Sequence, residues 1–94
     1  MDSEFHYYNS VIDIGLTENA TWDMILTSLP EKTGIKIAAW KDSYPNLTSP
    51  SGSRQEITVT KCANGYSTIV VWDIDANVIY YCSHNGNNYT VWKN

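Results

Sequence analysis

The sequence predicts an α+β two-layer domain, in which an antiparallel sheet of four to five strands carries one amphipathic helix (about 20–29) on one face. Two observations predict it. Residues 55–83 contain three runs rich in β-branched and aromatic residues, separated by short turns. Apolar residues recur at helical spacing between positions 22 and 29. We expect a single domain over 6–94, preceded by a cloning remnant or disordered tail at 1–5.

The C-terminal half is organised by Asn64-Gly65, the strongest hairpin signal in the chain. A type I′ turn needs positive φ at both central residues, which Asn and Gly tolerate. A two-residue turn here pairs Val59 with Val70, and a three-residue turn at 75–77 adds the third strand of a meander. In this register the helix-facing side carries Ile57, Val59, Val70, Trp72, Ile74, Val78, Tyr80 and Cys82.

The opposite side of the predicted meander is also apolar. It carries Ile69, Val71, Ile79 and Tyr81 between threonines. A contiguous apolar patch of this kind on an uncovered sheet face usually marks an interaction site. We therefore expect the 41–54 loop, a second copy of the chain or another protein to cover it.

The N-terminal half predicts a strand, the helix and a second strand. Residues 6–16 and 35–40 alternate or run apolar in the manner of strands. Asn19 or Thr21 can cap the helix, and Pro30 should end it. The apolar stripe of this helix consists of Trp22, Ile25, Leu26 and Leu29.

A last short strand is expected at 89–93.

Residues 41–54, which are rich in Ser and Pro, read as a long loop, either a mobile linker or a binding loop. Tyr44 and Leu47 are its only large side chains. Because the chain has more Trp and Tyr than a small core needs, several should meet a partner or pack half-buried. The candidate binding residues are Trp40, Tyr44, Leu47, Ile69, Val71, Ile79, Tyr81 and Tyr89.

Charge narrows the classes of partner. With ten acidic and six basic residues the net charge is −4, which suits neither nucleic acid nor an anionic membrane surface. No apolar run approaches the roughly 18 residues of a membrane span. Three N-x-T triplets occur where chance gives about one or two, so they are a weak signal of glycosylation. We expect another protein, self-association or a glycan as partner, and no nucleic acid.

The residues with reactive or metal-binding side chains form no recognised motif. The meander places a strand between Cys62 and Cys82, which predicts two free thiols rather than a disulfide. Cys82 and His84 lack an orienting third residue, and no zinc spacing joins the cysteines to the histidines. The calcium-like start Asp73-x-Asp75-x-Asn77 lacks the later glycine and glutamate of such loops. We expect no enzyme activity, metal or cofactor.

Residues 10–37 (SVIDIGLTENATWDMILTSLPEKTGIKI) resemble the first strand–helix–strand of the short N-terminal domains of secretins and TonB-dependent receptors. The resemblance lies in the apolar strand, the T-W-x-x-I-L-x-x-L helix and the T-G-I-K-I segment. It covers under a third of the chain, and the second helix of those domains is missing. The resemblance implies a periplasmic docking module.

Taken together, these patterns favour a small non-catalytic protein-binding domain, such as an inhibitor or immunity-type protein. The alternative is an exported structural, adhesive or glycan-binding module of a cell-surface or secretion assembly. An inhibitor predicts an acidic patch formed by Asp13, Asp42, Asp73 and Asp75. A glycan-binding module predicts an exposed Trp or Tyr beside Asn or Asp in a shallow groove. The compartment stays open, with a lean to an exported or cell-surface location.

Overall fold

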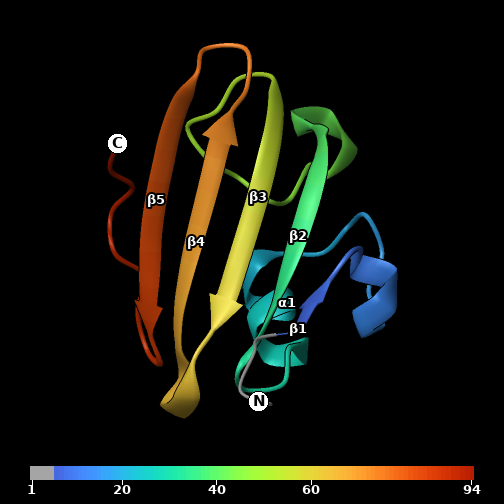
Figure 1. The fold of residues 1–94 in the computed structure, drawn as a ribbon, viewed down its shortest axis with the longest axis vertical. Helices are drawn as coiled ribbons and strands as arrows, with labels where there is room; N and C mark the ends of the chain where they lie inside the picture. The colour runs from blue at the N-terminus through green and yellow to red at the C-terminus, as the bar shows by residue number, and fades with distance from the viewer. Residues whose placement is uncertain (1–5) are drawn as a thin grey trace.

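The computed structural model describes residues 6–94, which form one five-stranded sheet with a single α-helix on one face (Figure 1). The expected α+β class, with its C-terminal meander, is confirmed. The prediction for residues 1–5 lies outside the described residues. The strands lie in the sheet in chain order, as β1 (His6–Tyr8), β2 (Thr33–Trp40), β3 (Arg54–Lys61), β4 (Tyr66–Asp73) and β5 (Val78–Asn85). The helix is α1 (Trp22–Ser28), and the 3-10 turns are η1 (Val11–Ile14), η2 (Lys41–Ser43) and η3 (Ala63–Gly65).

The sheet is mixed rather than purely antiparallel, because β1 runs parallel to β2. The strand expected over 6–16 ends at Tyr8, and the next apolar residues form η1 instead. A 3-10 turn has three residues per turn, so Val11 and Ile14 share its inner side while Ile12 is 75% exposed. The alternation that suggested a strand is therefore an i, i+3 pattern. Gly15 ends the turn in the left-handed region, at φ 82°.

Helix α1 is held at both ends by side chains. The Thr21 hydroxyl caps its first turn by accepting a hydrogen bond from the Met24 N–H at 3.2 Å. Leu29, before Pro30, has left helical geometry at ψ 131°. The Lys61 ammonium of β3 then donates to the carbonyl oxygens of Leu26 at 2.7 Å and Leu29 at 2.9 Å. This cation meets the negative end of the helix dipole and fixes α1 to the sheet.

The hairpin between β3 and β4 contains the expected turn and one extra residue. Asn64 and Gly65 both have positive φ, at 64° and 80°. The Tyr66 N–H donates to the Ala63 carbonyl, while the Tyr66 carbonyl accepts from the Cys62 N–H. Two residues thus oppose Tyr66, which is a β-bulge. The bulge shifts the pairing by one residue from the predicted register.

This one-residue shift reverses which side chains of β4 face the core. Val59 pairs with Ile69 rather than with Val70, and the prediction that Ile69 and Val71 lie on the outer side is wrong. Both are fully buried under α1, whereas Trp72 and Ile74 are exposed on the other side. The next turn spans four residues, 74–77, instead of three. The second difference compensates for the first, so Cys82 faces the core as predicted and Ile79 and Tyr81 face outward.

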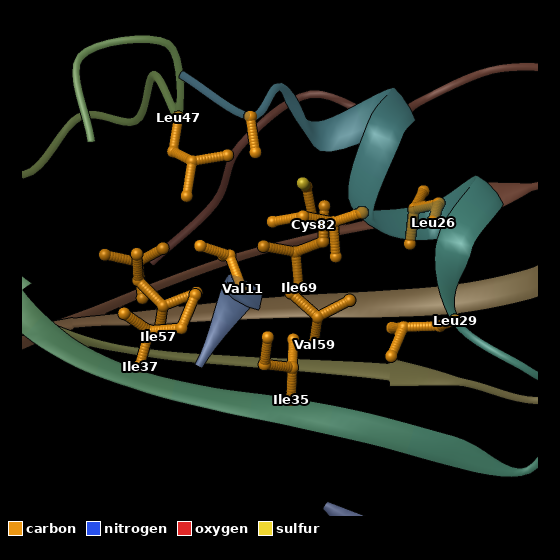
Figure 2. Packing of buried hydrophobic residues seen from close by; sticks show 13 residues of the cluster. Val11, Leu26, Leu29, Ile35, Ile37, Leu47, Ile57, Val59, Ile69 and Cys82 are labelled. Atoms are coloured by element: carbon orange, nitrogen blue, oxygen red, sulfur yellow. The ribbon is translucent and has the colours of Figure 1, made fainter. Parts of the chain in front are cut away.

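The core lies between the sheet and α1, with the 41–53 loop closing one end (Figure 2). Leu47 of that loop is only 3% exposed, and it packs with the core. The last strand expected, 89–93, is an irregular segment that touches β5 through two isolated bridges, Tyr81 with Lys93 and His84 with Tyr89. No helix within residues 6–94 is long and apolar enough to cross a membrane.

Candidate functional site

The candidate site is the face of the sheet that points away from α1. In Figure 1, α1 and the 41–53 loop lie behind the sheet, and no described segment crosses its front. We call this surface the outer face. The strand registers place on it the side chains of Lys36, Ala38, Trp40, Arg54, Glu56, Thr58, Thr60, Tyr66, Thr68, Val70, Trp72, Ile79, Tyr81, Ser83 and Asn85.

The centre of the outer face is apolar. Trp72 of β4 pairs directly with Ile79 of β5, and Val70 pairs with Tyr81. Ile74 extends the same side of β4 beyond the strand end, where its N–H donates to the Arg54 carbonyl. The exposed fractions are 42% for Trp72, 45% for Ile79, 46% for Tyr81 and 47% for Ile74. We call these five residues, Val70, Trp72, Ile74, Ile79 and Tyr81, the apolar cluster.

One corner of the outer face carries an ordered group of charges. The Arg54 guanidinium binds the Asp75 carboxylate at 2.5 Å and lies 5.3 Å from the centre of the Trp40 ring. The hydrogen bond from Arg54 is the main reason why the pKa of Asp75 falls to about 2. Trp40 remains 57% exposed beside the Arg54 guanidinium.

A shallow groove of about 480 Å³ borders the apolar cluster, between β4, β5 and the C-terminal segment. Backbone hydrogen bonds hold the C-terminal segment against β5. Tyr81 and Lys93 bond to each other, and the Thr90 N–H donates to the Ser83 carbonyl. The walls of the groove are mainly apolar. The lining includes Thr68, Val70, Tyr81, Ser83, Thr90, Val91 and Lys93.

The structure separates the predicted binding residues into four groups. Trp40, Ile79 and Tyr81 lie on the outer face, as expected. Ile69, Val71 and Leu47 are core residues and are removed from the candidate surface. Tyr44 packs half-buried against the core, and Tyr89 lies on the C-terminal segment. Sequence reasoning missed Val70, Trp72 and Ile74 because positions 69–72 are apolar on both sides, so alternation alone could not orient β4.

Tyr89 fastens the C-terminal segment to the helix side of the molecule. Its hydroxyl donates a hydrogen bond to the Asp23 carboxylate in the first turn of α1. Burial, and then this hydrogen bond, raise the pKa of Tyr89 well above its usual value. The rings of Trp92 and Trp22 meet nearby, with centres 6.1 Å apart. Tyr89 is therefore occupied in a structural contact, although it is 40% exposed.

Each of the three side chains of the calcium-like triplet is hydrogen-bonded to partners of its own. Asp73 is 5% exposed and accepts hydrogen bonds from Ser51, Gly52, Ser53 and Ala76. These bonds, led by the one from the Ala76 N–H, lower the pKa of Asp73.

Asp75 pairs with Arg54, and the Asn77 side-chain oxygen accepts from the Trp72 indole N–H at 3.2 Å. The triplet thus ties the 49–53 loop and the 74–77 turn to the sheet. Within residues 6–94, no three His, Cys, Asp or Glu side chains are grouped so that they could hold a metal ion.

The two cysteines are free thiols. Cys82 pairs with Ile69 in the core, while Cys62 lies at the bulge. Burial raises the pKa of the Cys82 thiol, which keeps it in the neutral, unreactive form. The His84 Nδ1 accepts a hydrogen bond from the Gly86 N–H at 3.1 Å, and the His84 ring packs on Tyr89. Cys82 and His84 therefore lack the features of an activated nucleophile and its base.

Comparison with known proteins assigns no family. No family model matches the sequence, and no curated protein or solved structure matches it either. The first strand that the resemblance implies within residues 10–37 is not found there, because Val11–Ile14 form η1, and the strand that runs parallel to β2 is β1, at His6–Tyr8. Without a matching family model, the resemblance carries no functional assignment.

Proposed function

We propose that this protein is a small non-catalytic protein-binding domain, which docks its apolar cluster onto an apolar patch of another protein. One observation supports the proposal most directly. The cluster lies on a single uncovered face, and four of its members are between 42% and 47% exposed. Exposed apolar patches of this contiguity mark interaction sites in soluble proteins. Trp and Tyr at such sites supply most of the binding free energy.

The form of the surface favours a protein over a small molecule. The apolar cluster is surrounded by polar side chains, with Thr58 and Thr68 on neighbouring positions and Glu56 opposite Trp72. An apolar centre with a polar rim is the usual anatomy of a protein interface. Arg54 at the corner adds a residue type that is enriched there.

The proposal rests on apolar contact rather than on negative charge. An inhibitor that uses an acidic patch would need Asp73 and Asp75 free. Asp73 is 5% exposed and accepts hydrogen bonds from the 51–53 segment, while Asp75 is paired with Arg54. Two of the four carboxylates expected for that patch are therefore engaged within the chain.

The test compares two double variants of matched chemistry. Trp72→Gln with Tyr81→Gln removes the centre of the cluster. Ile12→Gln with Met24→Gln makes the same kind of change at residues that are 75% and 43% exposed elsewhere. Each immobilised protein is exposed to host extract, and any protein held by the wild type is purified for titration calorimetry. We expect Kd to rise about thirtyfold for the first variant and to stay unchanged for the second.

Two results would contradict the proposal. A purified partner that binds the Trp72 and Tyr81 variant as tightly as the wild type would place the contact elsewhere. Failure to obtain any protein that binds the wild type directly, together with selective retention on a glycan array, would favour the second candidate below. Circular dichroism of both variants checks that each one keeps the fold.

A glycan-binding module is the second candidate, and the groove is the observation that favours it. The Trp72 indole N–H donates to the Asn77 side-chain oxygen, and the lining of the groove beside Tyr81 includes Thr68, Ser83 and Thr90. Aromatic faces stack on sugars, and hydroxyl and amide groups bind their hydroxyls. Titration with array-selected glycans should then shift the Trp72 indole N–H resonance, and Thr90→Val should weaken binding.

A further inference from the structure

The edge of the sheet at β2 is only partly covered. The three-residue strand β1 pairs with Thr33, Gly34 and Ile35. Strand β2 continues to Trp40, so residues 36–40 have β3 on one side and no strand on the other among the described residues. Figure 1 shows β1 beside only one end of the long β2 arrow.

One backbone bond fixes which residues point their polar groups to this edge. The Lys41 N–H donates to the Ser53 carbonyl at 3.1 Å, in register with the β2–β3 ladder. Hydrogen-bonded pairs alternate along an antiparallel ladder, so Ala39 bonds to β3 while Ala38 and Trp40 point their N–H and C=O groups away from it. Within residues 6–94, no other group bonds to Ala38 or to the Trp40 N–H on that side, whereas the Trp40 carbonyl, at the N-cap of η2, accepts the first bond of that turn. The edge therefore offers the N–H and C=O groups of Ala38 and the N–H of Trp40.

The opposite edge of the sheet, at β5, has a segment of the chain bonded to it. On β5, Tyr81 exchanges two bonds with Lys93, the Ser83 carbonyl accepts from Thr90, and the Asn85 N–H donates to the Asn88 carbonyl. The C-terminal segment thus covers that edge from Tyr81 to Asn85. Sheet edges are commonly blocked by proline, a bulge or a covering segment. Residues 36–40 (KIAAW) contain no proline, and their pairing with β3 is continuous.

We propose that this edge pairs with the same edge of a second copy, antiparallel and centred on Ala38. About a two-fold axis, Ala38 meets Ala38 of the second copy, and Lys36 meets Trp40. Ala38 is exposed, and its methyl group leaves room for the two backbones. Each Lys36 ammonium, which lies 4.7 Å from the centre of the Tyr7 ring, gains a second aromatic neighbour.

Self-complementary side chains are the reason to favour a second copy over an unrelated strand. Pairing of like chains places a cation opposite an indole on both sides of the axis, and it places no two like charges directly opposite each other. The two five-stranded sheets then continue into one, with both outer faces on the same side. This inference stands independently of the proposed function, since it uses the edge and not the apolar cluster.

The test measures association of the full chain by sedimentation equilibrium over a wide range of concentration. We expect wild type to dimerise. Ala38→Lys puts two ammonium groups across the axis and should weaken association by about tenfold or more. Asn87→Lys adds the same charge at an exposed residue of the turn after β5, at the opposite end of the sheet, and it should dimerise as wild type does. Melting curves confirm that both variants are folded.

Amide exchange locates the interface. Raising the protein concentration should slow exchange at Ala38 and Trp40, and a spin label at Ala38→Cys, with Cys62→Ser and Cys82→Ala, should report a short distance to its counterpart. The proposal is overturned if wild type stays monomeric at the highest concentration. It is equally overturned if a dimer forms that Ala38→Lys leaves intact, or one that protects another segment.

Discussion

Asp73 and Ser51 are joined beneath the sheet, where the carboxylate Oδ2 accepts a hydrogen bond from the Ser51 hydroxyl at 3.0 Å. Ser51 is 2% exposed and Asp73 is 5% exposed, so the contact lies inside the protein. Through it, the loop that follows β2 is fixed to the end of β4. The predicted loop is therefore an anchored part of the fold rather than a mobile linker.

The hydrogen bonds to Asp73 and Asp75 make the stability of the fold depend on pH under acidic conditions. The pKa values of Asp73 and Asp75 are lowered in the folded protein, to about 2 for Asp75, against about 3.9 in an unfolded chain. Their contribution is complete above the unfolded value and is lost as pH falls through the folded value. We expect the urea midpoint to be flat from pH 7 to 5 and to fall between pH 5 and 2. Asp73→Asn should lower the midpoint at pH 7 and flatten this acid limb, whereas an unchanged profile would contradict the assignment.

The orientation of β4 can be tested with two neighbouring valines. Val71 is fully buried and Val70 lies half-buried on the outer face. Val71→Ala removes two buried methyl groups and should lower the free energy of unfolding by about 2 kcal/mol. Val70→Ala should cost clearly less. The reverse order in denaturant titrations would restore the simple two-residue hairpin register.

Gly34 of β2 allows Tyr7 of β1 to pack closely against the sheet. A Cβ there would lie 2.5 Å from the Val59 carbonyl oxygen and 2.6 Å from the Tyr7 ring. We expect Gly34→Ala to lower the free energy of unfolding by about 1–3 kcal/mol and to speed amide exchange in β1. Gly52→Ala is the control, since nothing lies within 4 Å of its Cβ position. Equal stability of the two variants would show that β1 packs elsewhere.

The two thiols should react at different rates. Cys62 is half-buried, whereas Cys82 is 6% exposed and its pKa is raised by burial. A thiol reagent at neutral pH should modify Cys62 first and reach Cys82 only as the protein unfolds. In the Cys62→Ser variant, the fast phase of modification should disappear and only the slow phase should remain. A single fast phase for both thiols would mean that β5 does not bury Cys82 in the core.

Much of the architecture follows from local patterns in the sequence. The spacing of Ile25, Leu26 and Leu29 defines the buried side of the helix, and Asn64-Gly65 defines the turn. The orientation of β4 does not follow, because residues on both of its sides are apolar and the bulge at Cys62 depends on tertiary pairing. The predicted pairing differs from the observed one by one residue at each of the two turns, and the two differences compensate. The prediction is therefore right for the side on which Ile79 and Tyr81 lie and wrong for Ile69 and Val71.

Candidate binding residues were harder to predict than secondary structure. Aromatic content indicated a contact surface, but the same residue types pack cores and seal loops. Leu47 looked free in a polar segment, yet it packs in the core at 3% exposure. Trp72 was assigned to the core by the two-residue turn, yet it lies on the outer face. In both cases, long-range packing outside the local sequence decides the outcome.

The order of the strands has a consequence for how the chain acquires its structure. From β2 to β5 every strand pairs with its successor, so the meander closes only short loops and the 41–53 loop. The pairing of β1 with β2 instead spans the segment that contains α1. Loop closure slows contacts between distant residues, so we expect the meander to form in the rate-limiting step and β1 to join afterwards. Substitutions in β1 should then mainly speed unfolding, which makes this three-residue strand a determinant of the lifetime of the folded state.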